Sequence, residues 1–334
     1  MKLTDLSTIR ALCAAHGFSF SKGLGQNFIV NPGVCPKIAE AAGLDSTMGV
    51  LEIGPGFGVL TQELARRAGK VVAIEIDRRL PPLLAQTLAE FRNVAIVEGD
   101  VMELDLAALL RAHFPGMRVA VCANLPYYIT SPVLMRLLEQ RLPVEQITVM
   151  VQKEAAERLV AQPGTRMAGA ITCAVRYYAR PQMLFAVQPG SFYPPPKVTS
   201  AVIRLRPHAE PPVRPHSEAA MFRVIRAAFG QRRKTAANAV SSGLGLPKET
   251  VLAALCNARI PATARPEQLT LQDYAAFSDA LGAALGQAPD NLKQAPDAAG
   301  RSSDALEQVS DTMGQAPDAY APTRTSAEKP AQAM

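Results

Sequence analysis

One stretch, residues 50–77, constrains the fold of this chain more than any other part; it reads VLEIGPGFGVLTQELARRAGKVVAIEID. An apolar run stops at Gly54, closely spaced glycines follow, and residues 61–68 have helical spacing. A second apolar, β-branched run over residues 70–76 contains Glu75 and is followed by another acid. The order of strand, glycine turn, helix and strand predicts a βαβ unit that opens a parallel sheet.

The spacing of the three glycines Gly54, Gly56 and Gly58 narrows the choice of ligand. Glycine lets the backbone turn sharply and lets a ligand approach the main chain. A nicotinamide-binding G-x-G-x-x-G motif would have its third glycine at position 59, where this chain has Val59. The observed G-x-G-x-G spacing favours a nucleoside without phosphates, such as S-adenosylmethionine, and Glu75 can accept hydrogen bonds from ribose hydroxyls. A dinucleotide site and a purely structural turn remain open at this point.

Length and composition indicate a globular protein with two domains. The chain has 334 residues, of which 48% are hydrophobic and 19% charged. No apolar stretch reaches the roughly 18 residues of a membrane span, and the N-terminus predicts an amphipathic helix rather than a signal peptide. The five cysteines are scattered and form no C-x-x-C pair, which argues against disulfides and zinc and fits a reducing cytoplasm.

The charge of the chain is unevenly distributed. The formal net charge is +6, but residues 287–334 carry four basic and seven acidic residues. The preceding 286 residues carry 31 basic and 22 acidic residues. A basic body favours a polyanionic partner such as nucleic acid, although an ordinary soluble surface explains the charge equally well.

Two loops before and after the glycine unit carry polar candidates. Asp100 follows a predicted strand over residues 93–97, at the edge where parallel sheets bind ligands. It could accept a hydrogen bond from an adenine amine, or it could simply cap a turn. Residues 21–32 contain Gln26 and Asn27 and form either a linker or a polar flap over the cofactor.

The most specific motif is Asn124-Leu125-Pro126-Tyr127, which follows a predicted strand over residues 119–123. Methylation of an adenine amine is difficult because the nitrogen lone pair is delocalised into the ring. The side-chain carbonyl of Asn124 and the main-chain carbonyl of Leu125 can accept from the amine and free that lone pair. Pro126 offers no competing N–H, and Tyr127 can stack on a base that has left its helix.

The remaining chain adds an aromatic candidate and a basic helical region. Residues 170–179 are predicted as a strand with a basic aromatic edge. Phe192 precedes three prolines, and it forms either the second face of a base sandwich or a hydrophobic plug. Residues 208–217 form a proline-rich linker, and the sequence after it predicts helices. Basic residues concentrated there are candidates for phosphate contacts: Arg223, Arg226, Arg232, Arg233 and Lys234.

Eight sequence motifs carry a further resemblance: GLGQNFIVNP, LEIGPGFGVLT, AIEID, EGD, NLPYYITSPVL, MVQKEAAERL, PGSFYPPPKVTSAV and FGQRRKT. Together they closely resemble those of the bacterial ribosomal RNA adenine dimethyltransferases of the KsgA (RsmA) family. The resemblance covers about residues 8–284 in order. It implies a cofactor site with Asn27 and Ile29 from the flap, Gly54 with its neighbour Gly56, Glu75 on the ribose, Asp100 on the adenine, and Asn124. It implies a reaction site at Asn124, Leu125, Pro126 and Tyr127, with Tyr127 and Phe192 stacking the target base.

The resemblance also implies the architecture and the activity. The expected fold is α/β, a class I S-adenosylmethionine-dependent methyltransferase with a Rossmann-like, mostly parallel sheet over residues 1–207. A small all-helical RNA-contacting domain over residues 208–285 and a disordered tail over residues 286–334 would follow. The expected reaction converts two adjacent adenosines near the 3′ end of 16S rRNA to dimethyladenosine with four methyl groups from S-adenosylmethionine. The expected protein is a metal-free cytoplasmic monomer that acts on the immature 30S subunit, away from membranes.

Three alternatives remain. The first is a related 23S rRNA adenine methyltransferase of the macrolide-resistance type, which the Leu125 motif and the length of residues 217–284 disfavour. The second is an RNA-binding assembly factor without catalysis, which the intact motif at Asn124 disfavours. The third is a nicotinamide oxidoreductase, against which the glycine spacing argues.

Overall fold

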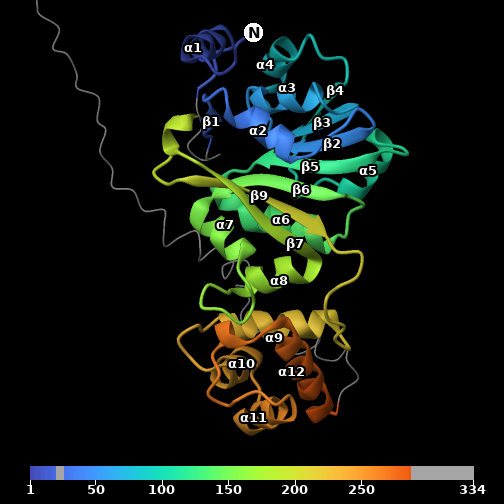
Figure 1. Cartoon of the computed structure of the whole chain (residues 1–334), viewed down its shortest axis with the longest axis vertical. Coiled ribbons are helices and arrows are strands. Elements are labelled where there is room, and N and C mark those ends of the chain that lie inside the picture. The colour runs from blue at the N-terminus through green and yellow to red at the C-terminus, as the bar shows by residue number, and fades with distance from the viewer. Residues whose placement is uncertain (20–25, 287–334) are drawn as a thin grey trace, which may run out of the picture. The chain divides into compact units, whose positions relative to one another are not determined.

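The structure is a computed structural model that describes residues 1–19 and 26–286, and its centre is a seven-stranded sheet (Figure 1). The strand order is β4-β3-β2-β5-β6-β9-β7. Strands β4 to β6 run parallel in this order, whereas β9 is antiparallel to both β6 and β7. The bounds are β2 (Met48–Ile53), β3 (Lys70–Glu75), β4 (Val94–Glu98), β5 (Arg118–Asn124), β6 (Gln146–Gln152), β7 (Ala179–Val187) and β9 (Ser200–Pro207).

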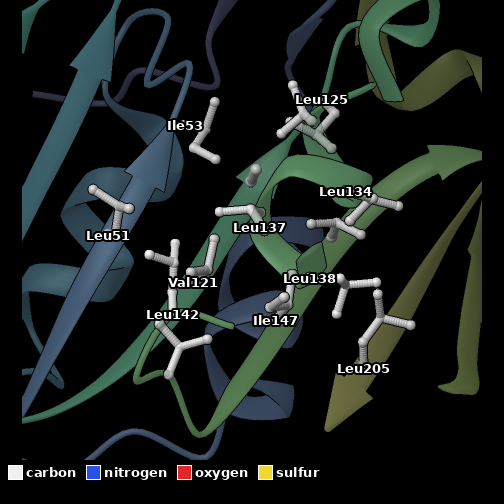
Figure 2. Packing of buried hydrophobic residues seen from close by; sticks show 14 of the residues in the cluster. Leu51, Ile53, Val121, Leu125, Leu134, Leu137, Leu138, Leu142, Ile147 and Leu205 are labelled. Atoms are coloured by element: carbon white, nitrogen blue, oxygen red, sulfur yellow. The ribbon is translucent and has the colours of Figure 1, made fainter. Parts of the chain in front are cut away.

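The central strands are apolar because helices cover both faces of the sheet. Leu51 and Ile53 of β2 point to one face and pack with Val121 and with the leucines of α6 (Figure 2). Val50 points to the opposite face, where it packs against α2 and α3. The helices between residues 34 and 178 are α2 (Val34–Ala41), α3 (Val59–Ala65), α4 (Pro81–Thr87), α5 (Leu106–His113), α6 (Thr130–Glu139), α7 (Lys153–Val160) and α8 (Ala170–Tyr178).

A short second sheet joins two segments that are far apart in the sequence. Strand β1 (Phe28–Ile29) pairs antiparallel with β8 (Phe192–Tyr193). The amide N–H of Val30 continues this contact by donating to the carbonyl of Ser191, at 2.8 Å. Helix α1 (Leu6–Ala15) packs with α4 over a cluster that contains Phe28. The loop that begins at Gln26 is therefore attached to the loop that carries Phe192.

The predicted helical region is confirmed after residue 217. Its helices are α9 (Glu218–Phe229), α10 (Ala236–Leu244), α11 (Lys248–Asn257) and α12 (Leu271–Ala284). Ser217 caps α9 through Ala220 N–H at 3.3 Å, and Thr270 with Asp273 forms a capping box on α12. The core of this region continues onto Cys173 and Tyr177 of α8, so the helical region packs directly on α8.

The strand predicted over residues 170–179 is wrong. These residues form helix α8, and β7 begins only at Ala179. Helix α8 is buried along Thr172, Cys173, Ala174 and Val175, because it lies between two apolar clusters. Its β-branched and aromatic residues favour a strand by propensity, and packing between the two clusters overrides that preference.

Two further observations concern disulfides and the signs of a membrane span or a metal site. All five cysteines are free thiols. In the described residues, no helix has the length and apolar character needed to cross a membrane, and no cluster of three metal-binding side chains is found. The predicted tail falls almost wholly outside the described residues, which end at residue 286.

Candidate active site

A cavity of about 230 Å³ lies at the carboxyl edge of the parallel strands. Ligands bind at this edge in open α/β sheets. The wall combines residues of the β1 segment, the loops after β2, β3 and β4, and the loop after β5. Among the predicted residues, the following line it: Asn27, Ile29, Gly54, Gly56, Glu75, Asp100, Asn124, Leu125, Pro126 and Tyr127.

The loop after β2 is built so that the main chain itself forms the cavity wall. Gly54 and Gly56 have φ values of +71° and +58°, which L-residues with side chains rarely adopt. A Cβ atom at Gly54 would meet no atom of the described residues within 4 Å, so no described neighbour fills this side of the cavity. A Cβ atom at Gly56 would lie 3.0 Å from the Phe28 ring, which itself stacks on Phe57. The glycines therefore keep the space open and let the β1 segment approach.

The acid at the end of β3 is buried and locked. Glu75 is only 5% exposed, and its Oε1 accepts the main-chain N–H of Asp77 at 2.8 Å. Burial raises the pKa of Glu75, while the main-chain N–H groups of Asp77 and Gly56 oppose this rise. Asp77 in turn accepts from Gln26 Nε2 at 2.9 Å, and the Arg79 guanidinium lowers the pKa of Asp77. The Gln26 contact holds the start of the flap next to the ribose candidate.

Asp100 after β4 caps a turn and also faces the cavity, and its contact with an adenine amine stays a prediction. Its Oδ1 accepts the N–H of Met102 at 2.8 Å and so caps the following turn. The residue also lines the cavity. The turn holds the carboxylate in place, so one oxygen can stabilise the loop while the other serves a ligand.

The loop after β5 presents acceptors on the other side of the cavity. Asn124 donates through Nδ2 to the carbonyl of Asn27 at 3.3 Å, which leaves its Oδ1 as an acceptor. The carbonyl of Pro126 accepts from Ile129 N–H, whereas the Leu125 carbonyl receives no hydrogen bond within the described part of the chain. The contact between Asn124 and Asn27 also connects the reaction loop to the flap.

Two residues that the sequence reasoning missed contribute to this edge. Ser200 is fully buried at the start of β9, and its Oγ lies 2.7 Å from the hydroxyl of Tyr127. Glu52 of β2 is 1% exposed and lines the cavity. Glu52 lies near a strand end, as Glu75 and Asp100 do, so the same argument from strand ends could have identified it.

Phe192 is not brought to the cavity wall. It is 4% exposed and packs in the core cluster that contains Val187 and Val202. Alternation along β8 turns Phe192 inward and leaves Tyr193 half-buried. This position matches the plug interpretation, and the stacking role of Phe192 stays a prediction that requires the side chain to leave the core.

The predicted RNA-contacting residues gather on α9 and the turn that follows it. Arg226, Arg232, Arg233 and Lys234 are exposed, whereas Arg223 is half-buried. Arg232 donates to the Ala168 carbonyl at 3.3 Å, so this turn is connected to the loop between α7 and α8.

The sheet order, the glycine loop after β2 and the polar residues after β3, β4 and β5 define a class I methyltransferase fold. Comparison with known proteins refines this class. Residues 17–280 match the family described as ribosomal RNA adenine dimethylase. The chain belongs to this family, and it is a methyltransferase.

Curated relatives and solved structures agree with this assignment. A protein of Alkaliphilus metalliredigens named ribosomal RNA small subunit methyltransferase A is 45% identical over 84% of this chain and 99% of its own length. A protein of the same name from Lysinibacillus sphaericus is 46% identical over 80% of this chain and 92% of its own length.

Two solved structures share the fold. A dimethyladenosine transferase from Plasmodium falciparum has a TM-score of 0.62 at 27% identity, covering 75% of this chain and 95% of its own. The 23S rRNA methyltransferase ErmE has a TM-score of 0.57 at 28% identity, covering 76% of this chain and 99% of its own.

Proposed function

We propose that this protein dimethylates the N6 amines of two adjacent adenosines near the 3′ end of 16S rRNA, with S-adenosylmethionine as the methyl donor. The small-subunit substrate is favoured because relatives named for it reach 46% identity, against 28% for ErmE. The substrate is the immature 30S subunit, and the enzyme works as a cytoplasmic monomer. Residues 208–285 form a separate RNA-contacting domain in this proposal.

The single observation that carries the proposal is the orientation of Asn124. Its Nδ2 is engaged by the Asn27 carbonyl, so Oδ1 is the atom that can accept an N6–H of adenine. The free Leu125 carbonyl supplies a second acceptor. Two acceptors on the amine favour a pyramidal nitrogen whose lone pair is available for attack.

The cavity fits the cofactor on structural grounds. The space above Gly54 is open, and the buried carboxylate of Glu75 offers acceptor oxygens to ribose hydroxyls. Asp100 accepts a hydrogen bond from the adenine amine of the cofactor. Asn27, Ile29 and Gly56 complete the wall of the cavity. When bound, S-adenosylmethionine supplies an electrophilic methyl group on a positively charged sulfur.

The residues of the chain act mainly by orientation and exclusion of water. Tyr127 stacks on the target base, and Pro126 presents no N–H to compete for the acceptors. No strong general base is required, because the methylated ammonium is acidic and loses its proton to water. The exposed residues Arg226, Arg232, Arg233 and Lys234, together with Arg223, contact the phosphate backbone.

The experiment is a labelling assay with two candidate particles. The protein is incubated with tritiated S-adenosylmethionine and either immature 30S particles or 50S subunits, and the labelled base is mapped. We expect label on two adjacent adenines of 16S rRNA. Label on 23S rRNA would transfer the assignment to the macrolide-resistance type of enzyme, and binding to 30S without label would favour an assembly factor.

A further inference from the structure

Glu52 is a buried carboxyl group for which the proposed reaction has no use. It lies on β2 in the wall of the cavity and is 1% exposed. Within the part of the chain that the structure describes, its Oε2 atom has no hydrogen-bond partner. Glu75 on the next strand, by contrast, accepts a main-chain N–H from Asp77. An unpartnered buried carboxyl group is costly and calls for a physical explanation.

The described groups around Glu52 include no cation to balance a negative charge, and the Thr61 hydroxyl offsets the cost of that charge only in part. Within residues 1–19 and 26–286, Glu52 forms no ion pair with arginine, lysine or histidine. Neighbouring elements contribute another acid, thiols and a hydroxyl: Glu75 from β3, Cys122 from β5, Cys35 from α2, and Thr61 from α3. The charge of Glu63 on α3 also raises the pKa of Cys35, but Glu63 itself forms ion pairs with Arg66 and Arg67.

Physical chemistry then decides the protonation state. Burial, with a smaller contribution from the charge of Glu75, raises the pKa of Glu52 to about 8, although the nearby Thr61 hydroxyl opposes this rise. The neutral form therefore dominates at neutral pH. A positive charge that enters the same cavity stabilises the carboxylate and lowers its pKa.

We propose that Glu52 is protonated in the ligand-free protein and gives its proton to solvent when the positively charged methyl donor binds. This inference rests on the proposed function, because it requires S-adenosylmethionine in this cavity. The only covalent change is loss of the carboxyl O–H proton to the buffer. After methyl transfer the sulfonium has become a neutral thioether, so one positive charge is lost and Glu52 takes up a proton again. Glu52 thus discriminates between the charged donor and the demethylated product.

The test is a calorimetric count of protons. S-adenosylmethionine is titrated into the full chain at pH 7 in buffers of different ionisation enthalpy, with wild-type protein and Glu52→Gln. We expect the wild type to release close to one proton more than the variant, with a clearly smaller difference for S-adenosylhomocysteine. Glu98→Gln, which removes an exposed carboxylate at the end of β4, is the matched control and should release as many protons as the wild type.

A second measurement does not depend on a variant. The infrared difference spectrum of the wild type should lose the carbonyl band of a protonated carboxyl group when S-adenosylmethionine binds. Binding with equal proton release by wild type and Glu52→Gln, or binding without loss of this band, would overturn the role of Glu52. Absence of any binding to the wild type is a different result, because it would overturn the proposed function itself.

Discussion

The two halves of the cavity edge are both built from the ends of parallel strands, but among the described residues one half carries acidic side chains and the other carries none. On the side of β2, β3 and β4, the strand ends carry Glu52, Glu75 and Asp100. On the side of β5, the described cavity-lining residues, from Asn124 to Ile129, carry no charged side chain. Parallel strands bring all these residues to one edge, so the difference arises from side chains and not from backbone topology.

This difference matches two different ligands. A cationic cofactor with ribose hydroxyls is favoured by acids. In the proposed reaction, the amine of the target adenine is instead oriented by neutral acceptors at fixed positions, the Asn124 side chain and the Leu125 carbonyl. In the proposed reaction, one sheet edge binds the methyl donor electrostatically and orients the target adenine by hydrogen bonds.

The largest expected effect tests the neutral half. Asn124→Ala removes the oriented Oδ1, and we expect a loss of methyl transfer of about a hundredfold or more, as for other transition-state acceptors and donors. The measurement is single-turnover methylation of 30S particles, with the circular dichroism melt as a check on folding. Asn31→Ala is a suitable control, because Asn31 also donates once through Nδ2 but does not line the cavity. Near-normal transfer by Asn124→Ala would refute the assignment of the amine pocket.

The next effect tests the acidic half. Glu75→Gln removes the charge from the ribose acceptor, and we expect the dissociation constant of S-adenosylmethionine to increase roughly tenfold to a hundredfold. Affinity for 30S particles should stay unchanged, since Glu75 lies on the cofactor side. Calorimetry for the cofactor and filter binding for the particle separate the two. An unchanged cofactor affinity would show that another group holds the ribose.

A third effect concerns stability and pH. Because the pKa of Glu52 rises from 4.5 to about 8 in the folded state, the folded protein binds the extra proton between these values. Stability is therefore highest at the acidic end of this window and falls by up to about 1.4 kcal/mol per pH unit as pH rises. Urea unfolding from pH 5 to 8.5 measures this dependence. The Glu52→Gln variant should lose this component, and parallel curves for both proteins would exclude it.

The smallest effect tests the hydrogen bond between Ser200 and Tyr127, which positions the loop after β5. Ser200→Ala and Tyr127→Phe each remove the bond between the two hydroxyls, worth about 1 kcal/mol. We expect each to raise KM for the 30S particle several-fold while kcat stays close to the wild-type value. The double variant should be no worse than either single variant, because only one contact is lost. Additive losses would show that Ser200 and Tyr127 act separately.

Much of the site could be predicted because it depends on local sequence. Gly54, Glu75, Asp100 and Asn124 each follow or end an apolar run, and parallel strands place such positions on one edge. Local pattern also predicted the strands β2, β3, β4 and β5 and the helices after residue 217.

The rest depended on tertiary contacts. The contact of Ser200 with Tyr127 depends on the antiparallel pairing of β9 with β6, which brings Ser200 next to the Tyr127 loop. The inward direction of Phe192 follows from the pairing of β8 with β1, which no local pattern indicates. Helix α8 was missed because its β-branched and aromatic residues favour a strand, and the packing that overrides this preference is tertiary.

The short ladder between β1 and β8 has a consequence for successive turnovers. It consists of two residue pairs, and its β1 member Ile29 also lines the cofactor cavity. Each methyl group requires reloading of the donor site. If β1 moves aside for reloading, its hydrogen-bonded partner β8 moves with it, or the ladder opens. A displacement of Ile29 and the position of the segment around Phe192 are thus mechanically linked.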